Sequence, residues 1–184
     1  MGELTELLEA ARNGESGAID RVVTLTYREL RALAHQRLRG AGAITHLDTT
    51  SLVNECYLRL VKVGELKAES RAHFIAYAAH VMRSIVVDLV RKRRAQRRGG
   101  DLAPVTLDTA LPDPASTGED LLLRLDAALE ELARLDERLV KVVEMRYFAG
   151  LTSEEIASAL GVTERTVRRD WQKARLLLHR ELAP

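Results

Sequence analysis

Residues 152–175 read TSEEIASALGVTERTVRRDWQKAR, a stretch with the layout of two short helices joined by a tight turn. Thr152 followed by Glu155 is a capping box, which predicts the start of the first helix. Gly161 stands where the chain must turn, because glycine adopts a positive φ with little strain. Thr163 can cap the second helix. The pattern predicts a helix-turn-helix, the motif that places a recognition helix in the DNA major groove.

The second helix of this pair has two distinct faces. Apolar residues recur along it every three or four positions and predict a buried stripe, namely Val167, Trp171, Ala174 and Leu178. The other face is polar and basic, and its candidate DNA contacts are Arg165, Thr166, Arg168, Arg169, Gln172 and Lys173. An ordinary helical hairpin could show the same caps and turn. The small Ala157 at the helix crossing, the short turn and the basic face favour DNA binding.

The composition predicts an all-α protein. The 184 residues are 46% hydrophobic but only 4% aromatic, with four prolines and no alternating strand-like runs. The single Cys56 excludes an internal disulfide, and its apolar neighbours predict a small core residue. The five histidines are scattered, and we find no metal-ligand spacing, no nucleophile with a partner base and no phosphate-binding glycine loop. We therefore expect no catalytic residue, no metal, no cofactor and no enzymatic activity.

Targeting signals are not expected in this sequence. Residues 1–12 are acidic, and the apolar run within them is too short for a signal peptide. We also expect no apolar stretch long enough to cross a bilayer. These observations predict a cytoplasmic protein that does not bind membranes.

The charge is distributed unevenly along the chain. The formal net charge is +1, but residues 1–98 carry +6, residues 99–120 carry −5 and residues 121–184 carry zero. Residues 99–120 also contain three prolines and no basic residue, which predicts a flexible linker. Two helical domains, 1–98 and 121–184, are therefore expected on either side of it. The linker acids are expected to attract the basic residues 91–98.

Further helices are predicted from caps, glycines and apolar spacing. In the first domain we expect helices over residues 4–13, 19–39, 51–63 and 71–98, with a loop over 40–50. In the second domain we expect one helix over residues 121–135 and another over 137–149. The second of these is expected to be capped by Asp136 and ended by Gly150.

The helix over residues 71–98 has an apolar stripe and ends in RKRRAQRR, residues 91–98. One interpretation is a core helix whose basic end is solvated and suits the negative end of the helix dipole. The other is that the basic end contacts nucleic-acid phosphates. Tyr77, His80 and Arg83 lie earlier on the helix and could stack on, and hydrogen-bond to, unpaired bases.

The order of these elements resembles the extracytoplasmic-function (ECF) branch of the bacterial sigma-70 family over nearly the whole chain. SLVNECYLRLVK, residues 51–62, resembles the helix that binds polymerase. FIAYAAHVMRSIVVDLVRKRR, residues 74–94, resembles the helix that opens and reads the promoter −10 element. Residues 135–178 resemble the domain that binds the −35 element.

The resemblance implies a role for each candidate residue. An ECF sigma factor directs core RNA polymerase to promoters and helps to melt them, while the polymerase itself performs nucleotidyl transfer. Leu52, Glu55 and Arg59 would face the β′ clamp helices, and the β subunit would be a further contact. Tyr77, His80 and Arg83 would meet the melted −10 strand. Arg91, Arg93 and Arg94 would hold its phosphates, and the basic face of the recognition helix would meet the −35 element.

One segment departs from the family pattern. An acidic cluster usually precedes the polymerase-binding helix, whereas this chain reads Asp48-Thr49-Thr50-Ser51. Because some family members with this change are paired with Ser/Thr kinases, Thr49, Thr50 and Ser51 are candidate phosphorylation sites. The alternative is that Thr50 or Ser51 simply caps the helix. An anti-sigma factor is the other regulatory partner that the resemblance implies. The competing function is a one-component regulator whose helix-turn-helix binds an operator without polymerase.

Overall fold

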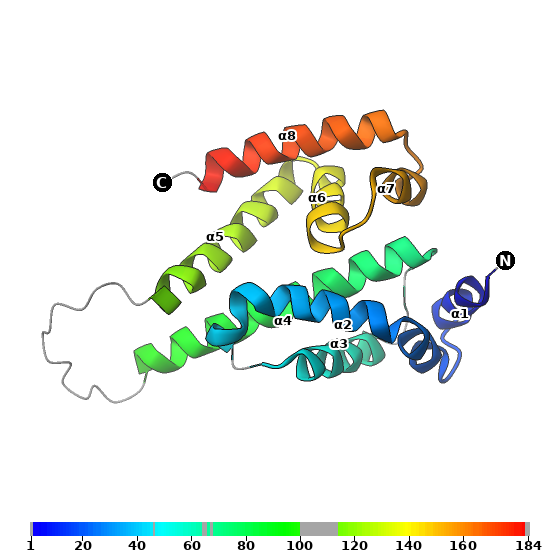
Figure 1. Cartoon of the computed structure of the whole chain (residues 1–184), viewed down its shortest axis with the longest axis horizontal. Coiled ribbons are helices and arrows are strands. Elements are labelled where there is room, and N and C mark those ends of the chain that lie inside the picture. The colour runs from blue at the N-terminus through cyan, green and yellow to red at the C-terminus, as the bar shows by residue number, and fades with distance from the viewer. Residues whose placement is uncertain (1, 46, 64–65, 67, 100–113, 183–184) are drawn as a thin grey trace, which may run out of the picture.

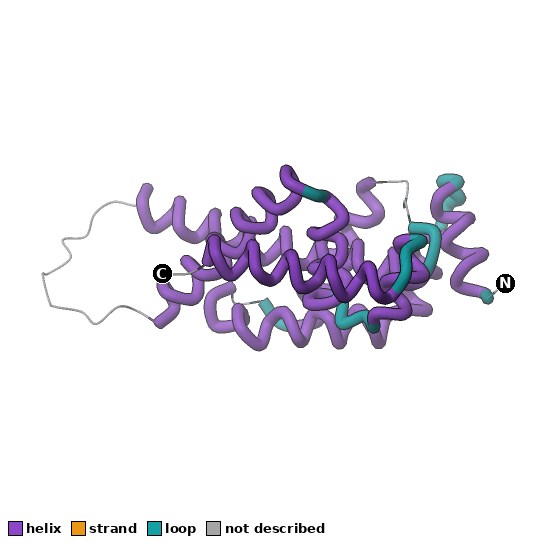
Figure 2. Tube along the Cα trace, turned by 90° about the horizontal axis from the view of Figure 1, so that it is seen from above, coloured by secondary structure: helices purple, strands orange, loops and turns teal. Residues whose placement is uncertain are grey.

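The computed structural model describes residues 2–45, 47–63, 66, 68–99 and 114–182. Within these residues the secondary structure is helical, with short connecting loops and no strand (Figure 2). The predicted all-α class is confirmed.

The N-terminal half contains four helices, α1 (Glu3–Arg12), α2 (Ala18–Thr45), α3 (Thr49–Val63) and α4 (Arg71–Gly99). The C-terminal half contains α5 (Pro114–Leu135), α6 (Glu137–Val143), the π-helical turn η1 (Glu144–Phe148), α7 (Ser153–Leu160) and α8 (Glu164–Leu182). Figure 1 shows the C-terminal helices lying along the N-terminal group, with α4 and α2 facing them.

Two boundaries differ from the prediction. Helix α2 continues to Thr45, through part of the segment that we expected to be a loop. A glycine inside a helix costs only about 1 kcal/mol, so Gly40 does not by itself end the helix. Helix α5 begins at Pro114, within the predicted linker, because the fixed φ of proline suits the first turn of a helix. Of the predicted linker, residues 100–113 lie outside the described residues.

The predicted helix over residues 137–149 is divided in two. Asp136 caps α6 by accepting a hydrogen bond from the Arg138 N–H at 3.0 Å, as expected. The last turn widens into η1, where the Ala149 N–H donates to the Glu144 carbonyl at 2.8 Å. Gly150 then adopts a φ of 71° and ends the segment, also as expected. Single π-helical turns occur frequently at functional sites.

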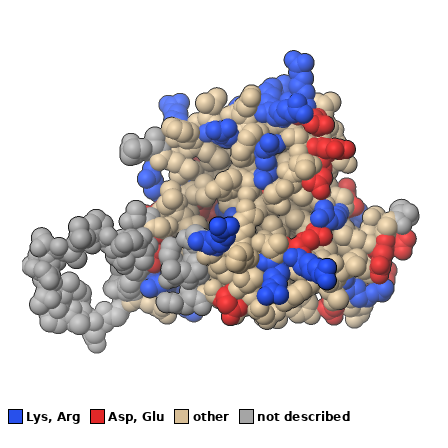
Figure 3. Space-filling view, in the orientation of Figure 1, with Lys and Arg blue, Asp and Glu red and all other residues tan. Residues whose placement is uncertain are grey.

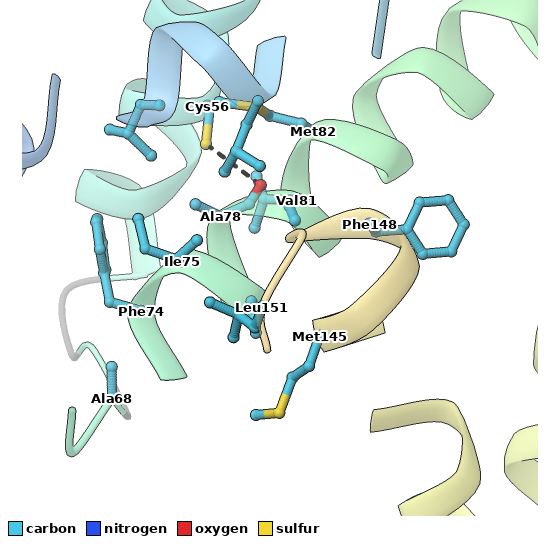
Figure 4. Close-up of a cluster of buried hydrophobic side chains, with 14 of the residues drawn as sticks. Cys56, Ala68, Phe74, Ile75, Ala78, Val81, Met82, Met145, Phe148 and Leu151 are labelled. Carbon is cyan, nitrogen blue, oxygen red and sulfur yellow. Dashed lines mark hydrogen bonds between the residues drawn. The ribbon is translucent and has the colours of Figure 1, made fainter. Parts of the chain in front are cut away.

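One contiguous hydrophobic core joins the two halves of the protein. Phe74, Ala78 and Met82 line the buried face of α4 and are fully enclosed. Figure 4 shows Met145 and Leu151 of the C-terminal half in the same cluster as these α4 side chains. Cys56 is buried there, as predicted, with its Sγ 3.9 Å from the Ala78 carbonyl oxygen. The two predicted domains therefore pack together in this structure.

We expected no apolar stretch long enough to cross a bilayer, and helix α4 shows that this prediction was wrong. Its residues Arg71–Gln96 are long and apolar enough to cross a bilayer by length and composition alone. However, 61% of its most apolar 18-residue window is buried inside the protein, as in the core helix of a soluble domain. The apolar length of α4 is explained by its central place in the core.

Candidate nucleic-acid interface

The helix-turn-helix forms as the sequence predicts. The Thr152 hydroxyl accepts a hydrogen bond from the Glu155 N–H at 3.2 Å, and the Glu155 carboxylate accepts one from the Thr152 N–H at 2.9 Å. This reciprocal capping box begins α7. Gly161 ends α7 with a φ of 63°, in the left-handed region. Thr163 then caps α8 by accepting a hydrogen bond from the Thr166 N–H at 3.2 Å.

The two faces of α8 also match the prediction. Val167 and Ala174 are fully buried, and Trp171 and Leu178 are half-buried against the core. On the opposite face, Arg165, Arg168, Arg169, Gln172 and Lys173 are exposed, and Thr166 is half-buried. Lys and Arg side chains gather over the N-terminal half of α8 in Figure 3. A surface hollow of about 390 Å³ lies among them, lined by Thr163, Arg165, Thr166, Arg168, Arg169 and Gln172.

An ion pair between a buried aspartate and an exposed arginine lies behind this face and was not predicted from the sequence. Asp170 is only 3% exposed and accepts a hydrogen bond at 2.7 Å from Nε of Arg138, which lies on α6. The hydrogen bond and charge of Asp170 raise the pKa of the Arg138 guanidinium. The available signal was an aspartate between Val167 and Trp171, next to the apolar stripe. The pair fixes α8 on α6 and so orients the recognition face.

The second candidate surface lies on α4, and it faces the C-terminal half. His80 Nδ1 lies 2.6 Å from a Glu144 carboxylate oxygen, and Arg83 donates to the same oxygen at 3.0 Å. Arg83 also donates to Asp126 of α5 in a close contact. Burial raises the pKa of the Glu144 carboxyl, but the hydrogen bond and charge of His80 and the charge of Arg83 outweigh that effect, so the pKa lies below its ordinary value.

The arginines at the C-terminal end of α4 are also paired with carboxylates, which lie on α5. Arg91 donates to Asp126 at 3.0 Å. Arg94 donates to Glu119 at 3.2 Å and makes a close contact with Asp120, while Arg93 lies 4.0 Å from Glu119. Two of the five acids in the predicted linker therefore do contact the basic helix end. The other three, Asp101, Asp108 and Asp113, lie outside the described residues.

Two further residues lie where α4 and α2 face the C-terminal half. Tyr77 was predicted as a site residue, and Arg37 was not. Tyr77 is half-buried and lines a hollow of about 450 Å³ together with His73, His80 and Glu144. Arg37 of α2 was missed, because a lone arginine in an amphipathic helix carries no sequence signal. It donates to the Phe148 carbonyl at 2.6 Å, and its guanidinium lies 4.2 Å from the centre of the Phe148 ring. Burial lowers the pKa of Arg37 to about 10.

Comparison with known proteins assigns the chain to a family. The family model described as ECF sigma factor matches residues 1–184. This chain belongs to the ECF sigma factor family. A curated relative, the probable RNA polymerase sigma factor RfaY of Xanthomonas campestris pv. campestris, is 25% identical over 179 residues. That match covers 95% of this chain but only 43% of the relative, so the chain spans less than half of the relative's length.

The polymerase-binding helix predicted for this sigma factor corresponds to α3. Leu52 is fully buried, so it is not available to a partner in this structure. Glu55 is exposed, whereas Arg59 donates to Ser84 at 3.1 Å and to Asp88 at 2.9 Å, both on α4. Leu58 and Val61 are the exposed large apolar residues within residues 51–62. The sequence-level prediction missed them, since the apolar residues alternate too closely along α3 to separate core from surface.

The sigma factor caps α3 with Asp48, not with Thr50 or Ser51. Asp48 Oδ1 accepts a hydrogen bond from the Ser51 N–H at 2.8 Å. This hydrogen bond lowers the pKa of the Asp48 carboxyl. The proposed capping role of Thr50 or Ser51 is therefore wrong. Both of these residues are exposed in the first turn of α3, and Thr49 is half-buried.

A metal site is not found in the described part of the sigma factor, where no group of three or more His, Cys, Asp or Glu side chains could hold an ion.

Proposed function

We propose that this ECF sigma factor works in the cytoplasm as an alternative sigma factor that directs core RNA polymerase to promoters and assists promoter melting. The observation that carries the proposal is the capped turn before α8, which leaves a basic face exposed at the start of the recognition helix. Side chains at this position enter the major groove in helix-turn-helix proteins. Catalysis belongs to the polymerase, and the chain contributes recognition.

The −35 element is read by the exposed face of α8. Arg165, Arg168 and Arg169 contact base edges or backbone at the N-terminal end, and Thr166 and Gln172 lie beside them. Lys173 contacts phosphate. Arginine contacts to guanine supply sequence discrimination, whereas phosphate contacts supply affinity for all sequences.

The −10 element is bound by α4. Tyr77, His80 and Arg83 contact the melted strand, because an aromatic ring stacks on unpaired bases and basic groups hold the backbone. Arg91, Arg93 and Arg94 neutralise phosphates on the adjoining turns.

Core polymerase is bound mainly by α3. Glu55, Leu58 and Val61 are exposed on it and contact the β′ clamp helices. Leu52 supports α3 from within the core, and Arg59 ties α3 to α4. The β subunit is a further contact.

The deciding experiment is transcription in vitro with core polymerase and a library of genomic promoters. The Arg165→Ala/Arg168→Ala/Arg169→Ala variant is expected to lose promoter selection, with about 1–3 kcal/mol lost for each base-contacting arginine. An Arg21→Ala/Arg28→Ala/Arg31→Ala variant removes the same charge from exposed positions on α2 and serves as the control. Unchanged promoter-specific transcription by the α8 variant would show that the groove assignment is wrong.

Co-purification separates this function from the operator-binding alternative. A sigma factor binds core polymerase in the absence of DNA, whereas a one-component regulator shifts promoter DNA on its own. Failure to retain core polymerase, together with tight binding of the free chain to one DNA site, would favour the regulator.

Control by phosphorylation is the second part of the proposal. Thr50 is the favoured site, and its hydroxyl is exposed in the first turn of α3 beside the capping Asp48. A phosphate adds about −1.5 to −2 charges, close to the carboxylates that the family pattern has at this position. The helix N-terminus tolerates an anion well, so the modified helix stays folded. The added charge binds basic groups on the polymerase clamp.

The test compares polymerase binding by three forms of the chain. The unmodified protein is expected to bind weakly, a Thr50→Glu/Ser51→Asp variant to bind more tightly, and a Thr49→Ala/Thr50→Ala/Ser51→Ala variant to be insensitive to kinase. A Thr24→Glu/Gln36→Glu variant adds the same two charges at exposed positions on α2 and serves as the control. Full binding by the unmodified protein, with no gain from the acidic variant, would rule out the switch.

A further inference from the structure

The face of α4 that the proposed function assigns to DNA contacts the C-terminal half of the same chain, although the His80 and Arg91 side chains remain 46% and 53% exposed. Five of its six assigned residues, all except Tyr77, have a carboxylate partner on α5 or η1. Tyr77 lies in the hollow between α4 and the C-terminal half. The assigned side chains are therefore committed to protein contacts.

The carboxylates are distributed along the length of α4 that carries the assigned residues. Glu144 pairs with His80 and Arg83, Asp126 with Arg83 and Arg91, and Glu119 with Arg94. From His80 to Arg94 the contacts follow about 21 Å of helix at 1.5 Å per residue. Both a carboxylate and a phosphate accept charge-assisted hydrogen bonds from a guanidinium. A nucleic-acid strand and this set of acids cannot occupy the same arginines together.

A second contact reinforces the pairing without any carboxylate. Arg37 donates to the Phe148 carbonyl, and the guanidinium groups of Arg37 and Arg83 lie 4.2 Å and 5.7 Å from the Phe148 ring centre. Phe148 is 3% exposed. The ring thus covers two cations of the N-terminal half, one of which, Arg37, has no role in the proposed function.

We propose that the docked arrangement is an autoinhibited state of the free chain, in which α5 and η1 occupy the −10 DNA-binding face of α4 and must leave it before that face binds DNA. Undocking also exposes Arg37, which then adds a further cation beside Arg83 for the DNA backbone. The inference rests on the proposed function only in assigning α4 to DNA.

The test measures docking and DNA affinity in the same full-length chain. Dyes on Ala32→Cys and Leu176→Cys report the distance between α2 and α8, both positions being exposed. Affinity is measured by anisotropy with a fluorescent 20-nucleotide single strand at low salt. The Asp126→Asn/Glu144→Gln variant is expected to lengthen the distance and to bind the strand about tenfold more tightly.

Two comparisons make the result specific. A Glu130→Gln/Glu137→Gln variant removes the same charge from exposed positions on α5 and α6, and is expected to match the parent chain in both readouts. A Phe148→Leu variant changes no charge, keeps an apolar residue in the core, and is expected to shift both readouts in the same direction as the Asp126/Glu144 variant. Helix content by circular dichroism identifies any variant that has unfolded.

The outcomes are distinct. A longer distance with tighter DNA binding, absent from the control, supports autoinhibition. A longer distance without tighter binding overturns it, because the docked half then masks no DNA site. Tighter binding with an unchanged distance, or an equal gain in the Glu130/Glu137 control, also overturns it, because net charge alone then explains the affinity. Transcription with core polymerase tests the proposed function independently of either result.

Discussion

At the scale of single residues, the ion pair of Asp170 and Arg138 is asymmetric. Asp170 is almost fully buried, whereas the Arg138 side chain is 45% exposed. A buried charge that loses its partner is destabilising, while an exposed charge that loses its partner is solvated by water. The two members of the pair therefore contribute unequally to stability.

We expect Arg138→Met to destabilise the protein more than Asp170→Asn, although the two changes remove the same ion pair. Asp170→Asn should cost about 1–2 kcal/mol, because the amide still accepts a hydrogen bond and no buried charge remains. Arg138→Met leaves the buried carboxylate without its main partner. Thermal denaturation of both variants checks the order. Equal losses would mean that Asp170 is solvated more than its burial indicates.

Cys56 offers a second test at this scale. Burial raises the pKa of its thiol from 9.0 to about 12, so at pH 8 the reactive thiolate is about a thousandfold scarcer than for an ordinary cysteine. We expect the native chain not to react with a thiol reagent at pH 8, and the denatured chain to react fully. A Cys56→Ala/Leu176→Cys variant, with its thiol at an exposed site, is the reactive control. Rapid reaction of the native chain would show that the core around Cys56 opens readily.

At the scale of elements, the turn between α7 and α8 depends on backbone conformation alone. Gly161 has a φ of 63°, and a Cβ added there meets nothing within 4 Å. Any penalty for a side chain at this position is therefore backbone strain and not a clash.

We expect Gly161→Ala to destabilise the protein by about 1 kcal/mol, because alanine rarely adopts the left-handed conformation. Gly161→Asn should cost less, since asparagine tolerates this conformation better than alanine. Chemical denaturation measures both. If alanine and asparagine at position 161 cost the same, strain in the left-handed region is not the cause.

The π-helical turn η1 contacts the N-terminal half at both of its ends. Its first residue, Glu144, pairs with α4, and its last residue, Phe148, binds Arg37 of α2. The widened turn is closed by the Ala149 N–H bonding to the Glu144 carbonyl and by the Leu151 N–H bonding to the Met145 carbonyl. The insertion in the helix thus occurs where tertiary contacts hold both of its ends.

At the scale of the whole molecule, docking of the halves combines favourable and unfavourable contacts. The ion pairs and the shared core favour it. Against it, Nε of Arg37 and Nε of Arg83 are buried and find no hydrogen-bond partner among the described residues, and an unsatisfied buried donor costs about 1–3 kcal/mol. Because these contributions oppose one another, a partner that binds α4 more strongly can displace α5 and η1 from it.

The docked state should weaken at acid pH. Because docking lowers the pKa of Glu144 below its ordinary value of 4.5, its stabilisation is fully present above that value and is lost as the pH falls through the lowered pKa. The charged groups facing Glu144 include His80 and Arg83 of α4 and Arg37 of α2. We expect the α2–α8 distance to lengthen below about pH 4.5. In the Glu144→Gln variant the α2–α8 distance should increase less at acid pH. Circular dichroism, measured in parallel, separates this change from global unfolding. An identical pH profile in Glu144→Gln would contradict this contribution.

The helical class, the helix-turn-helix and its exposed basic face could be predicted from the sequence alone. These depend on local rules: the Thr152 capping box, glycine at a positive φ, and apolar spacing within one helix. The position of Cys56 in the core followed from its neighbours for the same reason. Two predictions from local patterns were wrong. Helix α2 was expected to end before Gly40, and Thr50 or Ser51 was considered as the cap of α3 in place of Asp48.

The partners of the basic face of α4 could not be predicted in this way, because they come from other helices. Arg37, Asp126 and Glu144 are distant in sequence, and each on its own is an ordinary charged residue of an amphipathic helix. Their pairing depends on how α5 and η1 lie across α2 and α4, which no local pattern encodes. Leu52 was assigned to a partner and Asp170 was overlooked for the same physical reason. Which face of a helix is buried is set by the elements that pack on it.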